Sequence, residues 1–213
     1  MNTLNKDLSI CYHGLPIKPK YKGRTFNWIT IFQMIKSLTK DDNGNEFLYI
    51  DGWKFDVSYG LMYLKENRHW NYYLPPNGVK DKFILDVGGG CGETAKFFLE
   101  HGAFGVDIIE FNEKCREFLD YNSGYHNIRA WIKKFDMRDI YYDYYDLIKI
   151  DIEGYETELI PYLGEFNIDM VLETHSQYIT DEFIEKGFSY ARPNTEQNIE
   201  IYGGVNILCR WKK

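Results

Sequence analysis

Glycines and acids gather in one short stretch of the chain, and their types suit ligand binding. Residues 86–92 read Asp-Val-Gly-Gly-Gly-Cys-Gly, the pattern D-x-G-x-G-x-G, and Glu93 and Thr94 follow directly. Glycine has no Cβ and adopts positive φ without strain, so such a turn lets a ligand approach the backbone closely. A further acid, Glu110, comes 24 residues after Asp86 (110 − 86 = 24). A carboxylate there can accept both hydroxyls of a ribose, as in dinucleotide-binding folds.

The same stretch argues against two common phosphate-binding motifs. The dinucleotide fingerprint G-x-G-x-x-G, started at Gly88, requires glycine where this chain has Glu93, and no Walker lysine follows. A carboxylate at a helix N-terminus repels a pyrophosphate but tolerates an amino or sulfonium cation. Two acids, a glycine turn and no phosphate ligand therefore favour S-adenosylmethionine. The purely structural alternatives are that Asp86 caps the turn and that Glu110 caps the following helix.

A second group of polar residues follows two later apolar runs. Asp151 ends the run 147–150, and His175 follows the run 168–172. We expect the two runs to be neighbouring strands, so that both residues face one bound substrate. If a hydroxyl of that substrate reacts, either Asp151 or His175 could take its proton, with Glu153 orienting the substrate or the neighbouring loop. Structural alternatives are a helix cap for Glu153 and an ordinary hydrogen-bonded histidine for His175.

Metal binding is an alternative to the general-base role of these residues. Asp151, Glu173 and His175 could hold a divalent cation that lowers the pKa of the reacting hydroxyl of the substrate. Hard oxygen ligands with one imidazole permit such a site, but their spacing is not diagnostic. The metal is therefore left open and is not predicted.

Strand and helix patterns alternate from residue 82 onward, which predicts the elements that carry these residues. Two final β patterns, 188–191 and 205–211, suit an antiparallel pair at a sheet edge. We expect an α/β fold with a Rossmann-like doubly wound sheet, mostly parallel with an antiparallel C-terminal edge and helices on both faces. In such sheets ligands bind beyond the carboxyl ends of the strands. The other expected strands cover 83–87, 104–109, 127–132, 147–150 and 168–172, and the expected helices cover 93–101, 113–121, 156–163 and 180–186.

Residues 1–80 follow a different pattern and predict a small α+β cap. This cap either contacts the substrate directly or only covers one side of the sheet. A helical pattern covers 25–38, and a hairpin with a type I′ turn at Asp51-Gly52 covers 47–57. A second helical stretch lies near 59–70, and Pro75-Pro76 then breaks the chain. The Rossmann-like domain, which is expected to bind S-adenosylmethionine, would follow over residues 81–213.

Composition narrows the classes of partner. The 213 residues carry 25 Lys and Arg against 32 Asp and Glu, a net charge of −7, which argues against a nucleic-acid-binding protein. No apolar run approaches the roughly 20 residues of a membrane span, and the start lacks the apolar core of a signal peptide. The four cysteines lack CxxC or zinc-type spacing. We expect a cytoplasmic protein with reduced thiols.

Two motifs now support a family resemblance over roughly residues 81–211. The glycine turn with Glu110 resembles class I methyltransferases, and residues 148–156, Ile-Lys-Ile-Asp-Ile-Glu-Gly-Tyr-Glu, resemble the signature of FkbM-type methyltransferases. The chain departs from the family at Gly90, where asparagine is frequent, and at Phe111, where proline is frequent. The first 80 residues match no family pattern, so the resemblance does not identify the individual acceptor molecule.

The resemblance implies a set of cofactor contacts. Asp86 and the backbone of the turn glycines would hold the methionine part of S-adenosylmethionine, and Glu110 would hold the ribose. The remaining contacts would be Gly88, Gly90 and Gly92 in the turn, Glu93 and Thr94 beside it, Phe111 against the adenine, and Asp136 with Met137 near the adenine amino group.

The prediction is an S-adenosylmethionine-dependent methyltransferase that releases S-adenosylhomocysteine. What the resemblance implies about its substrate is a hydroxyl of a sugar, glycan or small natural product. One alternative is an N-methyltransferase acting on RNA or protein. Another is a binding module that keeps the cofactor fold without turnover. The oligomeric state is not predicted.

Overall fold

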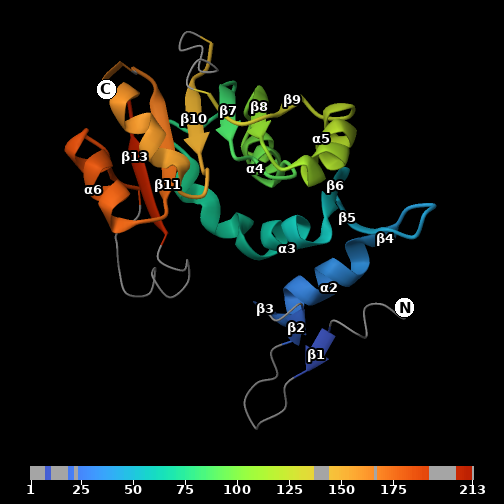
Figure 1. The fold of residues 1–213 in the computed structure, drawn as a ribbon. Coiled ribbons are helices and arrows are strands. Elements are labelled where there is room, and N and C mark those ends of the chain that lie inside the picture. The colour runs from blue at the N-terminus through green and yellow to red at the C-terminus, as the bar shows by residue number, and fades with distance from the viewer. Residues whose placement is uncertain are drawn as a thin grey trace. The chain divides into compact units, whose positions relative to one another are not determined.

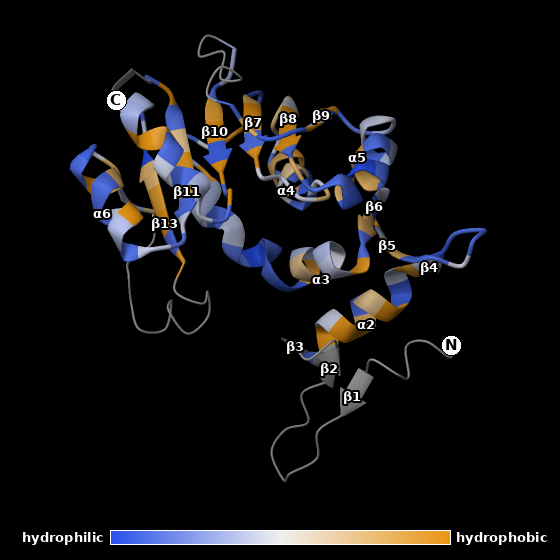
Figure 2. Ribbon diagram, viewed as in Figure 1, coloured by the Kyte–Doolittle hydropathy of each residue, from blue (hydrophilic) through white to orange (hydrophobic). Residues whose placement is uncertain are grey.

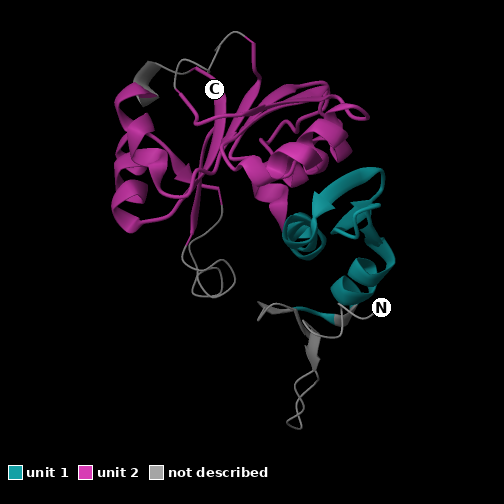
Figure 3. Ribbon diagram, turned by 45° about the vertical axis from the view of Figure 1, so that its right-hand side comes forward, with its two compact units in different colours: residues 1–68 teal, residues 69–213 magenta. Residues whose placement is uncertain are grey.

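A computed structural model describes residues 8–10, 19–21, 24–136, 144–165, 167–191 and 205–212. The chain divides into two compact units, residues 1–68 and residues 69–213 (Figure 3). A 3₁₀ helix, η1 (Asn67–Tyr73), spans the division. Residues 69–80 therefore group with the larger unit. Within the described residues, no helix is long and apolar enough to cross a membrane.

The described residues of the smaller unit form two three-stranded antiparallel sheets and two α-helices. A type I′ hairpin turn needs positive φ at both central residues, and Asp51 and Gly52 have φ of 48° and 88°. The predicted hairpin and its turn are confirmed. The elements are β1 (Leu8–Ile10), β2 (Pro19–Tyr21) and β3 (Arg24–Thr25), then α2 (Trp28–Ser37), then β4 (Leu38–Lys40), β5 (Glu46–Ile50) and β6 (Trp53–Asp56), and α3 (Val57–Glu66).

The larger unit is built on one seven-stranded sheet in the order β12-β13-β11-β10-β7-β8-β9 (Figure 1). Helix α4 packs on β8, α5 on β9, and α6 on both β11 and β13. The strands are β7 (Phe83–Val87), β8 (Gly105–Glu110), β9 (Ile128–Ile132), β10 (Leu147–Ile150), β11 (Asp169–Thr174), β12 (Ser189–Tyr190) and β13 (Asn206–Arg210). The helices are α4 (Glu93–Glu100), η2 (Glu113–Cys115), α5 (Arg116–Ser123), η4 (Tyr155–Glu165) and α6 (Gln177–Glu185).

The strand order confirms the predicted α/β fold. Strands β9, β8, β7, β10 and β11 are parallel, and they follow the first five places of the Rossmann order. Strand β13 pairs antiparallel with both β11 and β12, which gives the expected antiparallel C-terminal edge. The direction of strand addition reverses at β7, so β7 and β10 flank the switch point where such sheets bind ligands.

Burial on both faces explains the apolar strand sequences. Every residue of β8 and β10 is buried, and so is all of β7 except Phe83, which is half-buried. Parallel sheets covered on both faces have such continuous apolar strands, and Figure 2 shows these strands largely in the hydrophobic colour. Buried charges inside these strands, such as Asp86 and Lys149, are therefore exceptions that need partners.

Several elements differ from their predicted bounds by one to three residues, the predicted helix 113–121 is divided into η2 and α5, and two further differences have a clear physical reason. Strand β11 reaches Thr174, two residues further than expected, because Glu173 and Thr174 pair with Ile207 and Asn206 of β13. The helix after β10 is a 3₁₀ helix that contains Pro161, a residue that has no N–H to donate to a helical bond. Residues 192–204, between the two final β patterns, lie outside the described residues.

The turn after β7 yields a test of its backbone. A Cβ at Gly88, whose φ is +73°, would lie 1.6 Å from the carbonyl oxygen of Asp151. We expect Gly88→Ala to lower the free energy of unfolding by about 4 kcal/mol or more, since strain and steric overlap add.

Gly78→Ala is the matched control, because Gly78 has φ of +68° and a Cβ at this position would have no described atom within 4 Å. That variant should lose only about 1–2 kcal/mol, the cost of the left-handed backbone. Equal losses in urea unfolding of the two variants would contradict the proposed overlap.

Candidate functional site

The glycine turn between β7 and α4 forms one side of the site. Gly88, Gly90 and Gly92 all have positive φ, at 73°, 55° and 94°. The N–H of Gly88 donates to the carbonyl of Ile109 at 2.8 Å, which ties the turn to the end of β8. The alternating glycines of the D-x-G-x-G-x-G pattern thus meet a backbone requirement that other residues satisfy only under strain.

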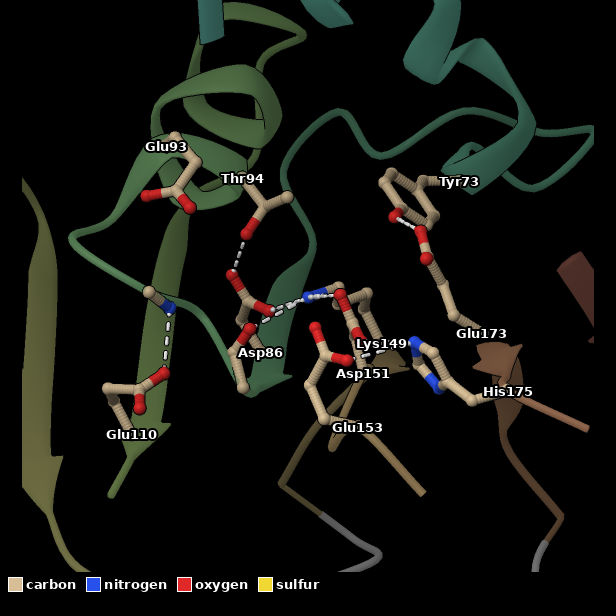
Figure 4. A network of polar contacts seen from close by, with 12 residues as sticks. Tyr73, Asp86, Glu93, Thr94, Glu110, Lys149, Asp151, Glu153, Glu173 and His175 are labelled. Atoms are coloured by element: carbon tan, nitrogen blue, oxygen red, sulfur yellow. Dashed lines mark hydrogen bonds and ion pairs between the residues drawn. The ribbon is translucent and has the colours of Figure 1, made fainter. Parts of the chain in front are cut away.

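Asp86 lies below this turn, inside β7. Its carboxylate accepts a hydrogen bond from the Thr94 hydroxyl at the start of α4, and its Oδ1 lies 3.1 Å from the Lys149 ammonium. Lys149 is the direct cross-strand neighbour of Asp86 in the β7–β10 pair. Figure 4 shows Thr94, Asp86 and Lys149 in a continuous polar chain.

Lys149 connects the turn with the neighbouring strand end. Its ammonium donates to the carbonyl of Gly88 at 3.0 Å and lies 4.0 Å from Asp151 Oδ2. Burial lowers the pKa of Lys149, but the neighbouring Asp86, Asp151 and Glu173 carboxylates outweigh it and raise the pKa above its ordinary value. Lys149 therefore remains a cation inside the sheet.

Glu93 occupies the N-terminal end of α4 with a buried carboxylate. Its Oε2 accepts the N–H of Cys91 at 3.0 Å, and burial raises its pKa well above the ordinary range. The position that a pyrophosphate takes in dinucleotide folds is thus filled by an acid of the chain itself.

Glu110 ends β8 beside the turn. One carboxylate oxygen accepts the N–H of Gly90 at 3.0 Å, and the other accepts the N–H of Asn112 at 2.7 Å. A carboxylate has about four lone-pair sites, so two acceptor positions remain after these bonds.

The predicted adenine contacts are less closely joined to this group. Phe111 follows Glu110 and has an exposed side chain. Asp136 is half-buried beyond β9, and Met137 lies outside the described residues. Their predicted roles stay predictions, as do those of the other site residues.

The carboxyl ends of β10 and β11 bring together the second group of predicted residues. His175 Nε2 lies 3.7 Å from Asp151 Oδ1 and 3.5 Å from Glu153 Oε2. Asp151 is half-buried, whereas the side chain of Glu153 is 81% exposed. Glu153 also has positive φ, 53°, a strained backbone that is frequent at functional sites. Asp151, Glu153 and His175 form one cluster, as predicted from their positions after neighbouring strands.

Three further residues support this cluster. His175 Nδ1 lies 3.0 Å from Oε1 of the buried Glu156, which also accepts the N–H of Gly154. The hydroxyl of Tyr73 donates to Glu173. Figure 4 shows Tyr73 and Glu173 on the same side of the network as His175.

The cluster shifts the acid–base properties of its members. The hydrogen bond to Glu156 raises the pKa of His175 to about 9. Burial raises the pKa of Glu173 to about 7, and burial also raises the pKa of Asp151. Two acidic groups and an imidazole thus compete for protons within one small region.

Sequence reasoning assigns no site role to Lys149, Tyr73 or Glu156. A lysine inside the apolar run Leu147-Ile-Lys-Ile is itself a signal, because a buried lysine requires a partner. Tyr73 has no such signal, since it lies 100 residues before Glu173. Glu156 stands out in the sequence only as the last acid of the FkbM-like stretch and the start of an expected helix.

Comparisons with known proteins give structural similarity without sequence similarity. No family model matches the chain, and no curated protein matches it. The ribosomal protein L11 methylase of Lactobacillus delbrueckii subsp. bulgaricus is similar at 20% identity over 63% of this chain and 72% of that one, with a TM-score of 0.48. An S-adenosylmethionine-dependent methyltransferase of Mesorhizobium loti is 14% identical over 67% and 96%, with a TM-score of 0.49. At these scores, the fold assignment rests on the strand order of this chain itself.

Substitution of Lys149 tests how the site is held together. Lys149→Met leaves the fully buried Asp86 without its cation, and we expect a loss of about 3–5 kcal/mol in unfolding free energy. Lys149→Met combined with Asp86→Asn should recover part of this loss, because no buried charge then remains uncompensated.

Lys82→Met is the control, since Lys82, directly before β7, pairs with Asp169 at the start of β11 but this pair is more exposed, at 22% and 14%. It should cost about 1 kcal/mol or less. If chemical denaturation shows the same loss of unfolding free energy for Lys149→Met and Lys82→Met, Lys149 does not stabilise the site as proposed.

Proposed function

We propose that the chain is an S-adenosylmethionine-dependent methyltransferase of the FkbM type that methylates a hydroxyl group. The observation that carries this proposal is the pairing of the glycine turn with Glu110 at the switch point. The N–H of Gly90 donates to one oxygen of Glu110, so the glycine turn and this carboxylate form one surface. The remaining lone pairs of the carboxylate can accept hydrogen bonds from ribose hydroxyls. The buried Glu93 at the start of α4 disfavours a dinucleotide.

The residues present suit this cofactor in charge as well as shape. When bound, S-adenosylmethionine supplies a methyl group on a positively charged sulfur. The turn glycines would accommodate its methionine part, and Glu110 its ribose. Phe111, Asp136 and Met137 remain the proposed contacts of the adenine. The carboxylates of Asp86, Glu93 and Asp151 disfavour an anionic ligand at this edge and favour a cationic one.

The acceptor would bind at the ends of β10 and β11, where the chain offers a proton acceptor. Asp151 Oδ1 is buried and accepts no hydrogen bond from the described part of the chain, so its lone pairs are available to an acceptor hydroxyl. His175 is held by Glu156 and would orient Asp151 or the acceptor. Much of the rate enhancement in a displacement of this kind comes from such positioning.

The proposed acceptor class rests on the FkbM-like resemblance, and the charge of the chain agrees with it. We propose a hydroxyl on a sugar, glycan or small natural product, because the net charge of −7 disfavours polyanionic partners. Residues 1–80 would supply the substrate region. We further propose that the protein acts in the cytoplasm.

Cofactor binding is tested by isothermal calorimetry with S-adenosylhomocysteine. We expect one binding site per chain, and we expect Glu110→Ala to weaken binding at least tenfold, about 1.4 kcal/mol, through loss of the ribose contact. Glu110→Gln keeps the side-chain volume and should also weaken binding.

Glu113→Ala is the control, because this exposed acid three residues later pairs with Arg116 and should leave affinity unchanged. Equal affinity of wild type and Glu110→Ala would falsify the ribose role. Tighter binding of NAD⁺ than of S-adenosylhomocysteine would remove the cofactor assignment itself.

Transfer of a labelled methyl group to a panel of sugar and phenolic hydroxyls tests the acceptor side. Asp151→Asn should lower kcat about 100-fold with little change in cofactor affinity, because a positioned base contributes about that much. Asp181→Asn on α6, where the acid only accepts from Gln177, should leave turnover unchanged.

The alternatives predict other results in the same assay. Unchanged turnover in both Asp151→Asn and His175→Gln would exclude these residues as acid–base groups. Transfer to amines alone would favour an N-methyltransferase acting on RNA or protein. Cofactor binding without any transfer would favour a non-catalytic binding module.

A further inference from the structure

Three side chains at the ends of β10 and β11 converge in a way that suits a metal ion. One donor atom each from Asp151, Glu173 and His175 lies within 4.8 Å of the other two. The donors of one octahedral cation lie about 3–4 Å apart, given metal–ligand distances near 2.1 Å. Small side-chain rotations therefore close the remaining gap.

The orientation of His175 is the first independent observation. Its Nδ1 lies 3.0 Å from the carboxylate of Glu156, whose side chain is fully buried. With Nδ1–H donating to that carboxylate, Nε2 faces Asp151 and Glu153. The raised pKa of His175 keeps a proton on Nε2 at neutral pH, so a metal ion would have to displace this proton to use the Nε2 lone pair. Metal-ligating histidines usually donate their other N–H to a carboxylate or carbonyl, which fixes the tautomer and the ring. Tyr73 holds Glu173 in the corresponding manner through its hydroxyl.

The charge balance is the second observation. Lys149 lies closest to Asp86, at 3.1 Å, and only 4.0 Å from Asp151. The remaining carboxylates around His175 are those of Asp151, Glu153, Glu156 and Glu173. The buried Oδ1 of Asp151 accepts no hydrogen bond from any residue that the structure describes. An acceptor oxygen without a donor, in a region of surplus negative charge, is suited to a cation.

We propose that Asp151, Glu173 and His175 bind one divalent cation, with Glu156 and Tyr73 orienting two of the three ligands. Two carboxylates with one imidazole favour Mn²⁺ or Zn²⁺ over Ca²⁺, which prefers six to eight oxygen ligands. Three protein ligands leave coordination positions open, as in catalytic metal sites. An open position could hold an acceptor oxygen and lower its pKa. That catalytic role rests on the proposed methyltransferase function, whereas binding of the cation does not.

The test uses Mn²⁺ as the probe and the full chain after treatment with EDTA and desalting. Electron paramagnetic resonance of Mn²⁺ in solution loses intensity as the ion binds, and we expect one ion per chain. Asp151→Asn and His175→Gln should each weaken binding at least tenfold. Glu156→Gln should weaken it less, because it removes only the orientation of His175. Mn²⁺ should also raise the melting temperature of wild type, since the ion binds the folded state.

Asp169→Asn is the matched control, because Asp169 lies at the opposite end of β11 and pairs with Lys82. It should leave Mn²⁺ affinity unchanged. Thermal unfolding of every variant without metal distinguishes loss of the site from loss of the fold. The proposal is overturned if wild type binds neither Mn²⁺ nor Zn²⁺ at millimolar concentration, or if Asp151→Asn and His175→Gln bind Mn²⁺ as tightly as wild type.

The proposed cofactor and the proposed metal site are tested by two separate binding measurements. S-adenosylhomocysteine binding measured on the EDTA-treated protein does not depend on the cation. Retained cofactor binding without Mn²⁺ binding would overturn only the metal site. Mn²⁺ binding without cofactor binding would leave the metal site standing and remove the methyltransferase proposal.

Discussion

The buried ammonium of Lys149 joins two strands of the larger unit at the point where the order of strand addition reverses. Lys149 is almost fully buried, and it lies between Asp86 on the neighbouring strand and the carbonyl of Gly88 in the turn above. Burying this charge is costly unless it is paired and hydrogen-bonded, and here both conditions are met. The register of β7 and β10 places Lys149 opposite Asp86. Because Lys149 also donates to the carbonyl of Gly88, the same register fixes the position of the glycine turn.

The same ammonium links the two halves of the site. On one side it supports the glycine turn, which in turn meets Glu110 through the Gly90 N–H. On the other side it lies near Asp151, at the end of its own strand. The close approach of Gly88 to the Asp151 carbonyl leaves no room for a side chain between these halves. The glycine turn and the end of β10 are consequently packed directly against each other, which brings the proposed cofactor and acceptor groups close together.

Acidic residues dominate the edge of the sheet that carries the site. Asp86 and Glu93 are buried near the turn, and Asp151 and Glu173 lie near His175. Part of this charge is balanced by Lys149, and burial raises the pKa values of Glu93, Asp151 and Glu173. An edge of this composition favours cationic ligands, which is consistent with both a sulfonium cofactor and a divalent ion.

The sequence by itself determined the strands, the turn and the sheet class. The predicted bounds of strands 83–87 and 147–150 are the observed ones, because continuous apolar runs reflect burial on both faces. The turn at residues 88–92 is evident from sequence because only glycine adopts positive φ readily at several nearby positions. The antiparallel edge also followed from sequence, from two β patterns after the last helix.

Only the tertiary structure decided which side chains meet. Lys149 opposite Asp86 depends on strand register, and Tyr73 reaches Glu173 across 100 residues of sequence. The length of β11 was set by its partner β13 rather than by its own residues. The orientation of His175 by Glu156 likewise depends on how the chain turns after β10. Local patterns encode burial and backbone conformation, whereas distances between side chains arise only when the strands are aligned.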